Sequence, residues 1–171
     1  PENIMVTPDD QVKVTDFGLA LARGDVRLTQ EGTIVGTVLY LAPEVVTGAP
    51  ADSRADLYAV GALLYELLTG RPPFISDDPM AIFSQILDAP LTSPRTLDPS
   101  IPVEIERTIV KLLSKDPAAR HSSAEETLAA LPSPAEAETL ATAATEQITT
   151  ERAALSLLER IVRSSSSTLK T

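Results

Sequence analysis

The strongest constraint on the fold is a continuous apolar segment, residues 57–65, within a proline-free stretch that runs from 55 to 69. As a helix this segment is apolar on every face, so protein or lipid has to bury it, and it is too short for lipid. Asp52 and Ser53 can cap its start, and Gly70 can end it. The sequence therefore predicts a buried central helix on which a helical domain is built.

Three shorter amphipathic helices are expected after it. The first begins at Asp78-Pro79, a cap followed by proline, the second ends at Asp116-Pro117, and the third opens with capping boxes at Ser122 and Ser123. The side chains expected to face the core are Met80, Phe83, Ile86 and Leu87 in the first, Ile105, Ile109, Leu112 and Leu113 in the second, and Leu128 and Leu131 in the third.

The first residues predict a β-hairpin. Two short β-type runs, 4–6 and 12–14, are joined by the turn-forming linker 7–11. The expected fold class is therefore mainly α with one small β-hairpin, α+β overall.

Asn3 precedes the first strand and Asp16 follows the second, so a hairpin brings them to the same open end. Amide and carboxylate oxygens are ligands of the kind that Mg²⁺ prefers, and substrate phosphates and water complete its coordination. On these two residues alone, ordinary turn-capping side chains are favoured over a magnesium site.

Composition excludes several functional classes. The net charge of −10 disfavours a nucleic-acid-binding surface, and the absence of cysteine excludes disulfides and thiolate metal sites. A reducing, cytoplasmic location fits, and no apolar run approaches the roughly 20 residues of a membrane span. Without cysteine a metal role for His121 is disfavoured, and a surface or capping side chain is expected.

Two prolines, Pro132 and Pro134, mark a division of the chain. The expected domain covers residues 1–131, and 132–171 forms an Ala/Thr/Ser-rich helical linker or disordered tail. An imperfect heptad in 134–163 leaves weak coiled-coil self-association open, with Glu151 at an inner position.

Five short motifs resemble those of the eukaryotic-type Ser/Thr protein kinases, as found in bacteria, in the order of the C-terminal lobe of that domain. They are Pro1-Glu2-Asn3 at the end of the catalytic loop, Asp16-Phe17-Gly18, Ala42-Pro43-Glu44 at the end of the activation segment, Asp56-Leu57-Tyr58-Ala59-Val60-Gly61 with Tyr in place of Trp, and Lys115-Asp116-Pro117-Ala118-Ala119-Arg120.

The resemblance implies transfer of the ATP γ-phosphoryl group to a Ser or Thr of a protein substrate. Asp16 and Asn3 would each hold a magnesium ion at the ATP phosphates, and Thr37 would orient the catalytic loop beside the acceptor site. Thr29 and Thr33 would lie in the activation loop, as phosphorylation sites or as ordinary loop residues.

The remaining matched residues would have structural roles. Glu44 and Arg120 would form a buried ion pair, and Asp56 would anchor the backbone of the catalytic loop. Phe17 would pack beneath the metal site, and Gly18 would complete the same motif.

The family's Gly-rich loop, its ATP-contacting Lys and its catalytic Asp and Lys lie before the position of Pro1, and the chain does not begin with Met. We therefore expect a piece of a longer protein that includes the missing N-terminal lobe, and no phosphotransfer by these 171 residues alone. A non-catalytic, pseudokinase-like scaffold is the alternative function.

Overall fold

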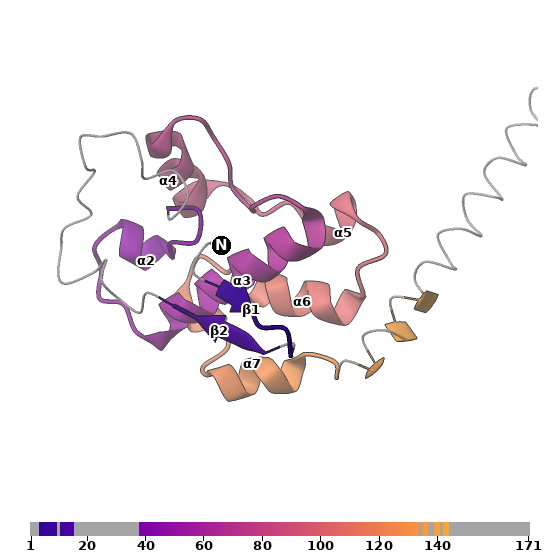
Figure 1. Ribbon diagram of the computed structural model, residues 1–171. Coiled ribbons are helices and arrows are strands. Elements are labelled where there is room, and N and C mark those ends of the chain that lie inside the picture. Colours follow the sequence, from indigo (N-terminus) through magenta and orange to yellow (C-terminus); the bar gives the residue numbers. More distant parts are fainter. Residues whose placement is uncertain are drawn as a thin grey trace, which may run out of the picture.

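The computed structural model describes residues 4–9, 11–15 and 38–133, together with the pairs 135–136, 139–140 and 142–143. In these residues it is mostly helical with one two-stranded sheet (Figure 1). No helix in the described part of the chain is long and apolar enough to cross a membrane.

The hairpin has the predicted strands, β1 (Ile4–Val6) and β2 (Val12–Val14). They pair antiparallel, with Ile4 opposite Val14 and Val6 opposite Val12. Thr7 closes the turn through Oγ1, which accepts from the Gln11 N–H at 3.1 Å. The strands are largely exposed, since Val6 and Val12 keep 65% and 66% of their surface.

The central helix α3 (Ser53–Thr69) begins and ends as its caps predict. The Asp52 carboxylate accepts from the Arg54 N–H, and Gly70 ends the helix with φ of 74°, a left-handed conformation that glycine adopts without strain. The expectation of burial on every face is wrong, because Val60 and Leu67 are exposed. The helices that pack on α3 leave one side of it uncovered.

Five further α-helices and one 3₁₀ helix accompany α3: α2 (Pro43–Val46), α4 (Pro79–Asp88), α5 (Pro94–Leu97), α6 (Val103–Leu112), η1 (Pro117–Ala119) and α7 (Ala124–Ala130). In Figure 1, α6 runs alongside α3, and α7 lies on the far side of α6. The short helices α2 and α5 and the 3₁₀ turn were not predicted from periodicity.

The core consists of two clusters. One lies between α3 and α6 around Tyr58, Tyr65 and Ile109, and the other joins Phe74 to the inner face of α4. Helices α3 and α6 approach closely at Gly61, where an added Cβ would lie 2.7 Å from Leu112 Cβ.

Two residues expected to face the core are placed differently. Met80 and Leu128 are exposed, while Ile82 on α4 and Thr127 on α7 are buried. His121, expected at the surface, is also buried, and its Nδ1 lies 3.1 Å from a Glu126 carboxylate oxygen. The same Glu126 side chain accepts hydrogen bonds from the Ser122 N–H and hydroxyl just before α7 begins.

Candidate functional site

The predicted site residues fall into two groups. Glu44, Asp56 and Arg120 are described by the structure. The remaining predictions lie outside the described residues: Asn3, Asp16, Phe17, Gly18, Thr29, Thr33 and Thr37.

The hairpin register bears on the predicted magnesium ligands. Ile4 is paired with Val14 at the open end of the hairpin. The chain continues from this pair toward position 3 on one strand and toward position 16 on the other. The donors that the sequence offers there, an amide and a carboxylate, suit Mg²⁺. Among the described residues no group of three His, Cys, Asp or Glu side chains could hold a metal ion.

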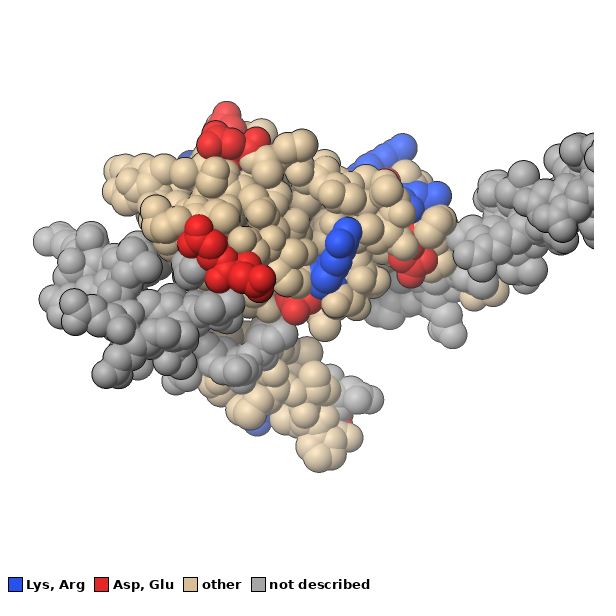
Figure 2. Space-filling model, turned by 90° about the horizontal axis from the view of Figure 1, so that it is seen from above, with Lys and Arg blue, Asp and Glu red and all other residues tan. Residues whose placement is uncertain are grey.

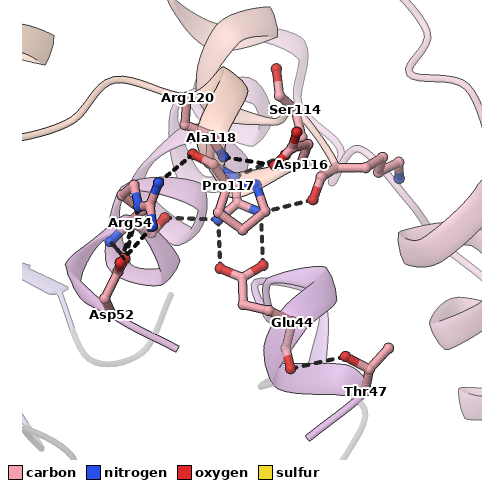
Figure 3. Close-up of polar contacts among 10 residues, drawn as sticks. Glu44, Thr47, Asp52, Arg54, Ser114, Asp116, Pro117, Ala118 and Arg120 are labelled. Carbon is pink, nitrogen blue, oxygen red and sulfur yellow. Dashed lines mark hydrogen bonds and ion pairs between the residues drawn. The ribbon is translucent and has the colours of Figure 1, made fainter. Parts of the chain in front are cut away.

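The ion pair between Glu44 and Arg120 is present and buried (Figure 3). Arg120 Nη1 lies 2.7 Å from Glu44 Oε1, and Nη2 lies 2.8 Å from Oε2, a two-pronged pairing of guanidinium and carboxylate. The side chains are 0% and 8% exposed. The pair therefore joins α2 to the residue that follows η1, across 76 positions of sequence.

Arg120 uses all five of its N–H donors. Besides the two bonds to Glu44, Nη1 donates to the Arg54 carbonyl at 2.9 Å, while Nε donates to the Ser114 carbonyl and Nη2 to that of Lys115. The guanidinium thus binds together the first turn of α2, the first turn of α3 and the segment that follows α6. A lysine could not replace it, because an ammonium group has three donors and no planar fork.

Two opposing effects act on the Glu44 carboxylate. Burial on its own would raise the pKa of Glu44, but hydrogen bonds from Arg120 and the attraction of its charge lower the pKa below its ordinary value. Beneath the pair, the Arg120 guanidinium carbon lies 5.0 Å from the centre of the Tyr58 ring. Glu44 is therefore an ionised, structural carboxylate.

Asp56, predicted to anchor the catalytic loop, lies in the first turn of α3 and is exposed. No hydrogen bond joins its carboxylate to another residue that the structure describes. Its proposed partner would come from a segment outside these residues, so the anchoring role remains a prediction.

The site contains contacts that sequence reasoning missed. The Tyr40 hydroxyl donates to Glu66 of α3 at 2.5 Å, and burial together with this carboxylate raises the pKa of Tyr40 to about 12. Lys115 Nζ donates to the Gln85 carbonyl at the end of α4 and lies 3.9 Å from the centre of the Phe74 ring. The partners in these contacts are 26 to 41 positions apart, and local periodicity carries no signal for such pairs.

No single charged patch dominates the described residues on the face seen in Figure 2. On the face seen in Figure 2, Asp and Glu side chains form separate groups, and Lys and Arg side chains lie between them. The net charge of −10 therefore does not by itself mark a binding surface on this face.

The amino-acid sequence is similar to those of several known proteins. A probable serine/threonine-protein kinase of Streptomyces coelicolor is 46% identical over 128 residues, which make up 74% of this chain and 19% of that protein. The serine/threonine-protein kinase PknB of Mycolicibacterium smegmatis is 39% identical over 128 residues, 74% of this chain and 20% of its own length. The kinase PrkC of Bacillus subtilis is 39% identical over 126 residues, with 74% and 19% covered.

The chain thus spans about a fifth of the length of these relatives. The family model for the protein kinase domain matches residues 1–130, which contain the hairpin, helices α2 to α7 and the Glu44–Arg120 pair. The chain belongs to the protein kinase domain family and is similar to bacterial serine/threonine kinases.

Proposed function

We propose that residues 1–131 form the C-terminal, mainly helical lobe of a kinase domain that transfers the γ-phosphoryl group of ATP to Ser or Thr of a protein substrate. The observation that carries the proposal is the buried Glu44–Arg120 pair. It joins two of the motifs on which the resemblance rests, and it ties the end of the proposed activation segment to the helical core.

The pair supports a defined position for the proposed substrate-binding segment. Residues 38–46 are held at Glu44 by Arg120, and Val38 is buried in the same cluster as Phe74 and α4. A protein acceptor needs a fixed platform, because phosphoryl transfer depends mainly on positioning and electrostatic stabilisation. Thr37 adjoins this held segment and is proposed to orient the catalytic loop beside the acceptor.

Asn3 and Asp16 are the residues proposed to hold Mg²⁺, with Phe17 and Gly18 supporting Asp16. Bound magnesium offsets the charge that develops on the phosphoryl group during transfer. The register of β1 and β2 supports this assignment. Ile4 and Val14 are paired at the open end of the hairpin, so the chain leaves for Asn3 and for Asp16 from the same place.

Thr29 and Thr33 are proposed phosphorylation sites, at which an added phosphate could pair with arginine and order the activation loop. Because the reaction consumes ATP, we place it in the cytoplasm.

Self-association through 134–163 is a further proposal, and concentration-dependent helicity of that peptide tests it. Helicity that does not change with concentration would refute it.

The 171 residues alone are proposed not to transfer phosphate, because the Asp and Lys that act on the acceptor hydroxyl in this family precede the position of Asn3. Radiolabelled ATP and a generic protein substrate test this with the 171-residue chain and with the natural polypeptide that contains it. We expect label transfer from the natural polypeptide only, and robust transfer by the 171 residues alone would refute the requirement for preceding residues.

Two variants of the natural polypeptide sharpen this test. Asp16→Asn should abolish transfer, because an amide is a weaker ligand for Mg²⁺ than a carboxylate. Asp77→Asn, a matched change in the loop before α4, should retain it. An inactive natural polypeptide would favour the non-catalytic scaffold, whereas an active Asp16→Asn variant would refute the proposed magnesium ligand.

A further inference from the structure

We infer that Arg54 is a positioning residue, which sets the place of the Arg120 guanidinium against Glu44, and that Asp52 fixes Arg54 for this role. The contacts of Asp52 and Arg54 that support this inference are seen in the structure and do not depend on the proposed function. Their importance for catalysis rests on the proposed function, because only a kinase needs the end of the activation segment in one defined place.

The first step is the pairing of Asp52 with Arg54 (Figure 3). Arg54 Nη2 lies 2.7 Å from Asp52 Oδ2, and Nε lies 3.0 Å from Oδ1. The same Oδ1 caps α3 by accepting from the Arg54 N–H at 2.9 Å. Asp52 therefore holds both the backbone and the side chain of Arg54, and these hydrogen bonds lower the pKa of Asp52 to about 2.

The second step is that Arg54 contacts both ends of the turn that leads to Arg120. Its Nη1 donates to the Pro117 carbonyl at 3.3 Å, at the beginning of η1. Its own carbonyl accepts from Arg120 Nη1 at 2.9 Å, just after η1 ends. A displacement of Arg54 would consequently move the start of the turn and remove one of the acceptors that orient the guanidinium.

The third step separates positioning from stability. The Asp52 and Arg54 side chains are 55% and 35% exposed, and exposed ion pairs contribute little to the free energy of unfolding. Arg120 and Glu44 are buried. Loss of the Asp52–Arg54 pair should therefore alter the geometry and protection of the buried pair while leaving most of the fold intact.

The test uses the ¹⁵N-labelled 171-residue chain and reads the Nε–H resonance of Arg120, a donor hydrogen-bonded to the Ser114 carbonyl at 2.8 Å. Arg54→Met removes the guanidinium. Asp52→Asn keeps a good helix cap but removes the charge that holds Arg54. Arg107→Met is the control, because Arg107 is exposed on α6 and has no ion pair within the described residues.

We expect Arg54→Met and Asp52→Asn to shift the Arg120 Nε–H resonance and to speed its exchange with solvent about fivefold, as for the loss of one hydrogen bond. The double variant should match either single variant, because both substitutions remove the same Asp52–Arg54 pairing. Arg54→Lys should restore part of the protection, and Arg107→Met should resemble the unchanged chain.

The inference is overturned if Asp52→Asn and Arg54→Met leave the resonance and its exchange unchanged, or if their effects add. Circular dichroism verifies that each variant is folded, and Asp52→Asn alone decides the matter if Arg54→Met does not fold. The readout needs no ATP. An inactive natural polypeptide would therefore contradict the proposed function but would not contradict the inferred role of Arg54.

Discussion

Arg120 shows how one side chain can organise a buried region that apolar contacts alone would leave undefined. Its five donors have five acceptors on three segments, and its charge has a single buried partner. The net contribution of such a pair to stability is small, since desolvation offsets attraction. Its removal is costly, because the remaining carboxylate is left buried and unpaired.

Replacement of Arg120 by methionine should therefore lower the free energy of unfolding by about 3–5 kcal/mol. Arg120→Lys should lower it by more than about 1 kcal/mol, because an ammonium group cannot satisfy the fork or all five acceptors. Urea titration of the 171-residue chain measures both values. Arg107→Met is the matched control, and an equal loss in that variant would contradict the role of burial.

The buried hydroxyl group of Tyr58 lowers the stability of the fold, and a substitution can remove it. Its ring is fully buried beneath Arg120, burial raises the pKa of its hydroxyl, and that oxygen has no hydrogen-bond partner among the described residues. Tyr58→Phe should keep the ring contact and raise the free energy of unfolding by about 1 kcal/mol. Thermal and urea unfolding check the change, and a clear loss of stability would reveal a partner for the hydroxyl.

At the scale of elements, the contact between α3 and α6 depends on Gly61. Ordinarily an alanine stabilises a helix interior by about 1 kcal/mol relative to glycine. Here the added Cβ would lie 2.7 Å from Leu112 Cβ and 3.3 Å from Leu113 Cγ, so the helices would have to separate. Gly61→Ala should therefore be destabilising by about 1–3 kcal/mol despite the better propensity.

Urea titration measures the effect of Gly61→Ala, with Val60→Ala as the control on the exposed side of α3. The control should change the free energy of unfolding by no more than about 0.5 kcal/mol. A stabilised Gly61→Ala variant would mean that α3 and α6 are not as close in solution as the structure has them.

The elements also show what the sequence can and cannot predict. Helix ends depend on local chemistry, so the caps at Asp52, Asp78 and Ser123 were identified correctly. Which face is covered depends on neighbours distant in sequence, and the inward assignments of Met80 and Leu128 failed for that reason. Periodicity groups residues on a face but does not say what lies against it.

For the whole molecule, motif order predicted more of the candidate site than composition did. It paired Glu44 with Arg120 correctly, because a resemblance carries information on contacts between distant segments. It gave no indication of Arg54, Tyr40 or Lys115, whose contacts depend on backbone carbonyls and side chains positioned by the folded helices. The predicted magnesium ligands lie outside the described residues and stay predictions.

Stability of the whole molecule should depend on pH through carboxylates held in their ionised form. Hydrogen bonds from Arg54 lower the pKa of Asp52 to about 2, those from Ser122 lower the pKa of Glu126 well below its usual range, and the pKa of Glu44 is lowered as well. Since each folded-state pKa lies below the unfolded value, the stabilisation is complete above about pH 4.5 and is lost as the pH falls.

We therefore expect the free energy of unfolding, measured by urea titration, to decline steadily from about pH 4.5 toward pH 2. Glu126→Gln should flatten this decline, because its amide no longer has a proton to gain on unfolding in acid. Glu104→Gln is the matched control on α6, where the carboxylate has no hydrogen bond to another described residue, and its profile should follow that of the unchanged chain. If Glu126→Gln and Glu104→Gln gave the same profile, the contacts of Glu126 with Ser122, Lys111 and His121 would not couple folding to protonation.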